Sequence, residues 1–119
     1  MRVSTSFRDF VLDQLSGVDR LRARAMFGGV GLYSDDVFFG ILAADVLYFK
    51  VDDSNRREFE AEGSRPFQPY PDRAMTMPYY NVPASILEDA SSLVAWARRS
   101  IKVAQVARKP TRSARRSKR

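Results

Sequence analysis

Carboxylates and Lys are the side chains with which this chain could catalyse a reaction, because its 119 residues include neither His nor Cys. That absence excludes Ser–His–Asp and Cys–His nucleophiles, disulfides, iron–sulfur clusters and Cys-ligated zinc. Two carboxylate pairs, Asp35–Asp36 and Asp52–Asp53, could share a proton or bind a hard cation. Both pairs also stand where a turn or a helix start is expected, and Asp is favoured there as a short acceptor. We therefore predict structural roles for both, with no catalytic residue, no cofactor and no metal.

A group of tyrosines offers a second kind of site. Tyr70, Tyr79 and Tyr80 stand near Arg73 and two methionines. Together they could line a pocket, which makes a small-ligand-binding or enzymatic domain an alternative function. Three prolines between residues 65 and 71 indicate a loop beside them. Aromatic packing under this loop is the plainer interpretation.

The segment Gly28-Gly29-Val30-Gly31 has the composition of a phosphate-binding loop. Such a loop opens a helix after a strand, so that free N–H groups meet the phosphate. Here the strand-like residues Leu32 and Tyr33 follow, and the chain contains no Gly-Lys-Ser or Gly-Lys-Thr. We predict a tight turn or bulge between two strands and no nucleotide site.

The basic side chains are unevenly distributed. The chain has 20 Lys and Arg against 14 Asp and Glu, a formal net charge of +6. Residues 108–119 hold seven of these cations and no acid, which leaves a net charge of −1 on residues 1–107. Such a segment attracts polyanions by counterion release without reading base sequence, so we expect non-specific nucleic acid as a partner. Its cations are Arg108, Lys109, Arg112, Arg115, Arg116, Lys118 and Arg119.

The helix before this segment adds two candidate nucleic-acid contacts. An apolar stripe at helical spacing runs from Leu93 to Ala104, and a cap at Asp89, Ser91 or Ser92 would begin the helix. Arg98 and Lys102 lie on the opposite face, which leads directly into the basic segment.

The N-terminal residues predict a helix. It begins in the Ser4–Ser6 cluster, where Ser6 and Asp9 have the spacing of a capping box, and a left-handed Gly17 ends it. Its expected buried stripe consists of Phe7, Phe10, Val11 and Leu15.

From residue 20 the period changes to two, because three arginines alternate with Leu and Ala over residues 20–25. This indicates a strand with a solvated face. Turn residues at 34–36 and 43–45 separate further short strands, so we expect an antiparallel meander. The strand over 37–42 is apolar on both faces, and its two sets are Val37, Phe39 and Ile41 on one face and Phe38 and Leu42 on the other. Its second face must be buried either within the monomer or against a second copy of the chain. The latter case makes a homodimeric interaction module another alternative function.

The rest of the chain predicts a helix over 56–62 anchored by Phe59 and ended by Gly63, then a loop over 65–71. A strand over 74–77 and an edge strand or extended segment over 78–83 precede the last helix. We expect an α+β, two-layer domain over 1–107, in which terminal helices pack on an antiparallel meander of about four to six strands. A disordered basic tail would follow over 108–119.

No stretch approaches the ~18 consecutive apolar residues of a membrane span, and the N-terminus does not have the pattern of a signal peptide. We expect a cytoplasmic protein with no membrane partner.

Four segments carry a family resemblance: ARAMFGGVGLYSDDVFFGIL at 23–42, LYFKVDDSNRREFEAEGSRPF at 47–67, MPYYNVP at 77–83 and LVAWARRSIKVA at 93–104. In this order they resemble the N-terminal domain of the TfoX/Sxy family, bacterial regulators of competence and DNA transformation. The resemblance extends from about Phe7 to Gln105, and the Met-Phe-Gly-Gly and Tyr-Tyr-x-Val-Pro segments are its most specific parts.

The resemblance implies a fold similar to secretion chaperones and a non-enzymatic, competence-related protein. Such a protein would act through contacts with a protein partner or a second copy, with the tail assisting nucleic-acid association. Competence regulators of this family carry a second, helical domain where this chain has the basic tail. The motif positions, which we interpret as structural, are Met26, Phe27, Gly28, Gly29, Gly31, Tyr33, Tyr79, Tyr80 and Pro83.

Overall fold

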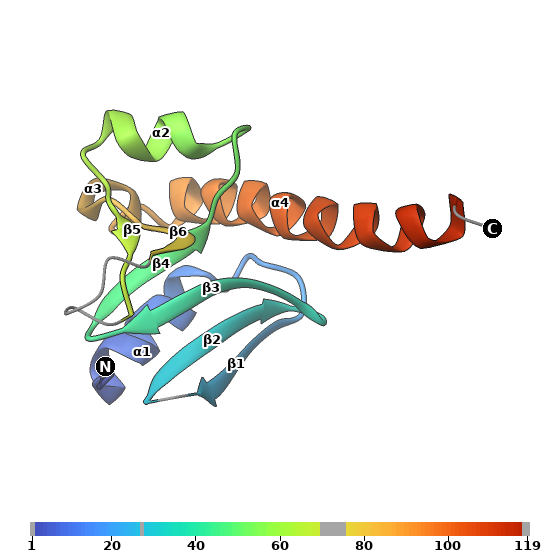
Figure 1. The fold of residues 1–119 in the computed structure, drawn as a ribbon. Coiled ribbons are helices and arrows are strands. Elements are labelled where there is room, and N and C mark those ends of the chain that lie inside the picture. The colour runs from blue at the N-terminus through green and yellow to red at the C-terminus, as the bar shows by residue number, and fades with distance from the viewer. Residues whose placement is uncertain (1, 27, 70–75, 118–119) are drawn as a thin grey trace.

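Six antiparallel strands form one sheet in the order β1-β2-β3-β4-β6-β5 in the computed structural model of the chain (Figure 1). The structure describes residues 2–26, 28–69 and 76–117, and of residues 108–117 it describes the backbone alone. The strands are β1 Leu21–Met26, β2 Gly29–Ser34, β3 Val37–Ala43, β4 Val46–Lys50, β5 Pro66–Phe67 and β6 Met77–Asn81. The helices are α1 Thr5–Gln14, α2 Arg56–Ala61, α3 Ala84–Leu87 and α4 Ala90–Ser117.

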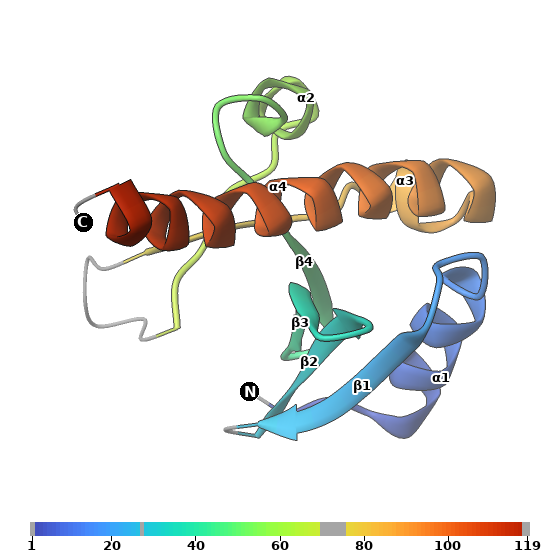
Figure 2. The same cartoon turned by 90° about the vertical axis from the view of Figure 1, so that its right-hand side faces the viewer.

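The helices form a second layer on one face of this sheet (Figure 2). Val11 of α1 and Leu93 of α4 are fully buried in one cluster with Phe49 of β4. The short helix α2 packs beside α4 and β6, where the Phe59 ring centroid is 4.7 Å from that of Trp96 and 6.2 Å from that of Tyr80. The expected α+β, two-layer architecture is thus confirmed.

The hairpin turns between the first four strands also agree with the sequence. β1 to β4 pair with their neighbours in chain order. Asp35, Ala44 and Asp45 have φ angles of +59°, +52° and +58°. This left-handed conformation matches the twist of the flanking strands in tight hairpins, so the turns at 34–36 and 43–45 are where the pattern predicted them.

The expected division of β3 into two faces is wrong. The pairing between β2 and β3 shifts beside Leu32, and the shift leaves Phe39 as an extra residue in β3. A bulge of this kind interrupts the alternation of side chains along a strand. Phe39 therefore packs with Leu42 under the helices, whereas Phe38 and Ile41 belong to a second cluster on the other face.

The first helix begins in the predicted serine cluster, but three of its details differ from the prediction. Its N-cap is Ser4, whose Oγ accepts a hydrogen bond from the Phe7 N–H at 3.2 Å. Ser6, the expected capping-box residue, lies inside the helix. Gly17 does not have a positive φ and does not end the helix. Phe10 is 42% exposed, because the core takes the residues on the neighbouring side of the stripe.

The segment after the proline-rich loop is an interior strand, and the prediction of an edge strand or extended segment is wrong. β6 lies between β4 and β5, because the short strand β5 inside the predicted loop shields its outer side. Residues 70–75, where the strand predicted over 74–77 would begin, lie outside the described residues. In contrast, the helix that Gly63 ends is confirmed, with Gly63 at φ +82°.

The last helix is longer than predicted. Its backbone continues to Ser117, whereas the sequence predicts a disordered tail over 108–119. The prediction rests on the Ser, Thr and Arg content beyond Pro110 and on the lack of apolar residues. Ala, Arg and Lys, which make up most of this segment, are nevertheless strong helix formers. Ala104 is the last buried residue of α4 that is described. The boundary at residue 107 stays a prediction. Among the described residues, no helix is long and apolar enough to cross a membrane.

Candidate nucleic-acid interface

The helix α4 has one buried side and one exposed side, as its sequence predicts. Leu93, Ala97 and Ser100 are fully buried, and Val103 and Ala104 are nearly so. Asp89, immediately before the helix, accepts hydrogen bonds from the hydroxyls of the two following serines. These bonds lower the pKa of the Asp89 carboxyl from its ordinary value, and the bond from Ser92 has the larger effect.

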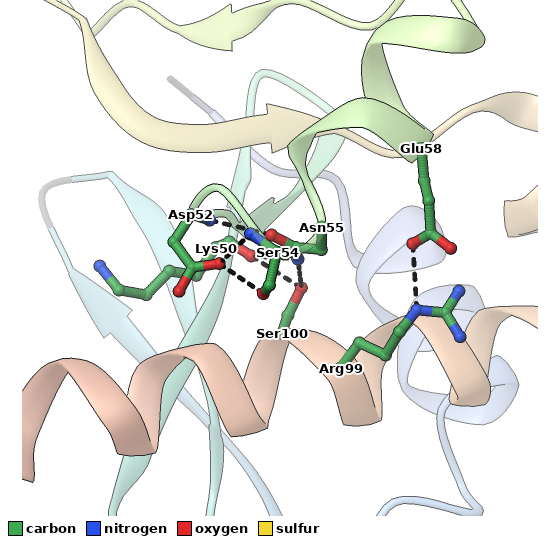
Figure 3. Close-up of polar contacts among 7 residues, drawn as sticks. All are labelled: Lys50, Asp52, Ser54, Asn55, Glu58, Arg99 and Ser100. Atoms are coloured by element: carbon green, nitrogen blue, oxygen red, sulfur yellow. Dashed lines mark hydrogen bonds and ion pairs between the residues drawn. The ribbon is translucent and has the colours of Figure 1, made fainter.

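The exposed side of α4 carries the two predicted contact residues, with different surroundings. Arg98 donates to the Gly17 carbonyl at 3.2 Å, so it also fastens the loop after α1 to α4. Lys102 is exposed and has no hydrogen bond or ion pair with another described residue. Arg99, which the sequence did not single out, is paired with Glu58 of α2 at 3.0 Å (Figure 3). Lys102 is therefore the cation of this part of α4 that is available to an anion.

Beyond Ala104 the helix extends away from the sheet and the other helices (Figures 1 and 2). Gln105, Val106 and Ala107 are exposed. The seven cations of the basic segment follow, five of them on the described helical backbone and Lys118 and Arg119 outside the described residues. Their roles as nucleic-acid contacts stay a prediction.

A buried polar network holds α4 against the end of β4, and the sequence did not predict it (Figure 3). Asn55 and Ser100 are 2% and 0% exposed. The Ser100 hydroxyl donates to the Lys50 carbonyl at 2.8 Å, and the Asn55 amide donates to the same carbonyl at 3.1 Å. The Asn55 side-chain oxygen in turn accepts from the Asp52 N–H at 2.9 Å. The one available signal was a polar residue at position 100 in an otherwise apolar helical stripe.

The carboxylate pairs occupy the predicted local positions. Asp35 is a turn residue with an ion pair to Arg20 at 3.6 Å. Asp52 begins the turn before α2 and accepts from the Ser54 N–H at 2.8 Å. The hydrogen bond from the Ser54 hydroxyl is the main cause that lowers the pKa of Asp52. Within the described part of the chain, no three acidic side chains gather in a way that could hold a metal ion.

The predicted tyrosine pocket is not assembled from Tyr79 and Tyr80, because adjacent strand residues point to opposite faces. Tyr79 packs with the cluster on the face away from the helices, and burial raises its pKa to about 12. Tyr80 lies on the helix side, where its hydroxyl donates to Glu60 at 3.2 Å. Tyr70 and Arg73 lie outside the described residues. An open depression of about 600 Å³ lies elsewhere, between the end of β4 and α4, and includes neither tyrosine.

A side chain would not fit at the motif glycine Gly29, and at Gly31 it would require its neighbours to shift. A Cβ on Gly29 would stand 2.6 Å from the Leu42 carbonyl oxygen, and one on Gly31 would stand 2.6 Å from Met26 Cε and 3.1 Å from the ring of Phe38. These contacts are those of a closely paired hairpin. Phe27 lies outside the described residues, Tyr33 stacks on a neighbouring ring, and Pro83 precedes α3.

The comparison with known families agrees with this arrangement of hairpin, sheet and final helix. The model of the TfoX N-terminal domain matches residues 13–104, which is more than three quarters of the chain. The chain belongs to the TfoX N-terminal domain family. A search of the curated proteins found no match. The TfoX N-terminal domain match ends at Ala104, the last residue of α4 described as buried, so the basic segment lies outside the match. The family is not a known enzyme family.

Proposed function

We propose that this TfoX N-terminal domain protein associates non-specifically with nucleic acid through residues 108–119, while its folded domain contacts a protein partner. The observation that carries the proposal is the separation of charge. Seven cations and no acid stand in the last twelve residues, and the rest of the chain has a net charge of −1. A segment without internal acids keeps its full attraction for phosphate.

The attachment of the basic segment to the folded domain supports this proposal. The Asn55–Ser100 network and the Arg99–Glu58 ion pair fasten the first half of α4 to the body. The exposed Lys102 continues the basic side of the helix toward the segment. Nucleic acid held by the segment would therefore lie beside the folded domain and the partner that this domain contacts.

The proposed role is non-enzymatic and regulatory. The absence of His and Cys removes the side chains that most often serve as general base or nucleophile. Membership of the TfoX family supports a regulatory role related to competence and DNA transformation in a bacterial cytoplasm. Since phosphate contacts do not read bases, the protein partner would supply any sequence preference.

Binding to an unrelated DNA duplex at about 50 and 200 mM salt tests the basic segment. We expect wild-type affinity to fall by on the order of 10³-fold between these concentrations, because up to seven phosphate contacts release counterions. A variant with all seven cations of residues 108–119 replaced by Gln would bind weakly at both salts. In a matched control, Arg and Lys exchange places at the same seven positions, and binding persists. If the Gln variant and wild type had equal affinity and equal salt dependence, the basic segment would not be what binds the duplex.

A further inference from the structure

The sheet face opposite the helices combines aromatic rings with unpaired cations. Among the described residues, α1 and α4 pack on the other face, around Phe39 and Phe49. The opposite face carries a separate cluster that includes Ile41 and Tyr79, with Phe38 partly exposed beside them. We call it the aromatic face, and it comprises Tyr33, Phe38, Ile41, Tyr48, Phe67 and Tyr79.

The rings of this face form two groups, and the rings within each group contact one another. Tyr33 stacks on Phe38 with centroids 5.1 Å apart, and Phe38 meets Tyr79 at 5.7 Å. Tyr48 meets Phe67 at 4.7 Å. Tyr33, Phe38 and Tyr48 are all partly exposed, so each retains ring surface that a ligand could cover. The groups span strands from β2 to β6, which makes an extended surface rather than one pocket.

Cations border these rings, and carboxylates are absent from the same strand positions in the described residues. Arg22 is paired with Tyr33 across the β1–β2 ladder, so it shares this face. The Arg24 guanidinium lies 5.9 Å from the Tyr33 centroid, and the Lys50 ammonium lies 5.1 Å from the Tyr79 centroid. Arg22 and Arg24 are exposed and make no ion pair with another described residue.

We propose that the aromatic face binds single-stranded nucleic acid, with bases stacked on Tyr33, Phe38 and Tyr48 and phosphates beside Arg22, Arg24 and Lys50. Unpaired bases offer flat rings that stack on aromatic side chains, and their backbone supplies a regular row of anions. A duplex hides its base faces and offers the anions alone. This binding extends the proposed function to a different surface. It also favours single strands over duplexes, between which the basic segment does not distinguish.

Charge favours this occupant over a second copy of the chain. In a two-fold symmetric contact the same patch meets itself, so the cations of one copy would find no carboxylate among the described residues of this face on the other. Such a contact would bury Arg22 and Arg24 without partners, which is costly. A polyanion neutralises all three cations at once.

Fluorescence anisotropy with labelled oligo(dT), oligo(U) and a duplex of equal length tests the proposal on the full chain. In wild type and in the Gln variant of the basic segment, we expect both single strands to bind more tightly than the duplex. Tyr33→Ala would weaken single-strand binding by on the order of tenfold, whereas Tyr33→Phe, which keeps the ring, would not. Phe10→Ala is the matched control, because Phe10 is an exposed ring on α1. Arg24→Gln would weaken single-strand binding, and Arg57→Gln, at an exposed site on α2, would not.

Three results would overturn the inference. They are equal single-strand affinity of Tyr33→Ala and Phe10→Ala, a preference for the duplex in the Gln variant, and a wild-type dimer in sedimentation that Tyr33→Ala dissociates. The last result would show that a second copy covers the face. Failure of the basic segment appears separately, as duplex binding that the seven Gln substitutions leave unchanged.

Discussion

The two faces of the sheet differ in what covers them and in how their polar groups are paired. On the helix side, Phe39 and Phe49 are fully buried, with ring centroids 5.8 Å apart. Polar groups at the margin of that layer, such as Asn55, are hydrogen-bonded within the protein. On the other side, rings such as Tyr33 remain partly exposed beside cations that have no acidic partner among the described residues.

This difference separates side chains that maintain the fold from side chains that are available for binding. A fully buried ring contributes its whole transfer free energy to stability, and its removal leaves a cavity in the core. A partly exposed ring on a sheet contributes less to stability, while its free surface suits a flat ligand. We therefore expect substitutions on the helix side mainly to lower stability, and substitutions on the aromatic face mainly to weaken binding.

The largest stability effect is expected for Phe49→Ala on the helix side. The ring is 0% exposed, so its removal should lower the free energy of unfolding by about 3–5 kcal/mol. Tyr33→Ala on the other face should cost about 1 kcal/mol. Urea denaturation followed by far-ultraviolet circular dichroism measures both. Equal losses for the two variants would contradict the division into a structural and a binding face.

A smaller effect is expected from the polar network beneath α4. Asn55→Ala should lower the free energy of unfolding by about 1–3 kcal/mol, because it leaves the part-buried Asp52 N–H without its acceptor and the Lys50 carbonyl without one of its donors. Ser64→Ala is the matched control, since the buried Ser64 hydroxyl has no hydrogen-bond partner among the described residues. That control should be neutral or slightly stabilising in the same urea titration. A neutral Asn55→Ala would mean that the network does not hold α4.

The smallest effect concerns the ionisation of Tyr79. Burial, and secondarily the nearby Tyr33, raises its pKa from 10 to about 12, so the folded state favours the neutral phenol. The resulting stability is fully present below pH 10 and is lost as the pH rises from 10 toward 12. The stability of Tyr79→Phe should therefore fall less than that of wild type between pH 10 and 12, and the two proteins should be equally stable at pH 7. Thermal unfolding at several pH values measures this. If the stabilities of the variant and wild type fell equally between pH 10 and 12, the raised pKa of Tyr79 would be contradicted.

Much of the sheet follows from local signals in the sequence. The turns at Asp35 and at Ala44–Asp45 stand between short apolar runs, which fixes the meander of β1 to β4. The alternation of arginines with Leu and Ala correctly predicts which side of β1 is exposed. These features depend on neighbours in the chain, which is why the pattern contains them.

The features that sequence failed to predict depend on contacts between distant segments. The bulge at Phe39 leaves no trace in a strand that is apolar at almost every position, so alternation assigned Phe39 and Ile41 to one face. The Asn55–Ser100 contact joins residues 45 positions apart, and neither position is distinctive alone. The aromatic face was missed for the same reason, because its rings come from five strands whose order is set by the whole sheet.

The central claim is that the aromatic face, unlike the helix side, is a binding surface. The most direct measurement is a two-dimensional ¹⁵N NMR titration of the full chain with a short oligo(dT). The account predicts that the largest amide shifts occur at Arg22, Arg24, Tyr33 and Phe38, with little change at Val11 and Leu93 under the helices. Shifts confined to the C-terminal part of α4, or shifts on α1 instead of β1 to β3, would contradict it.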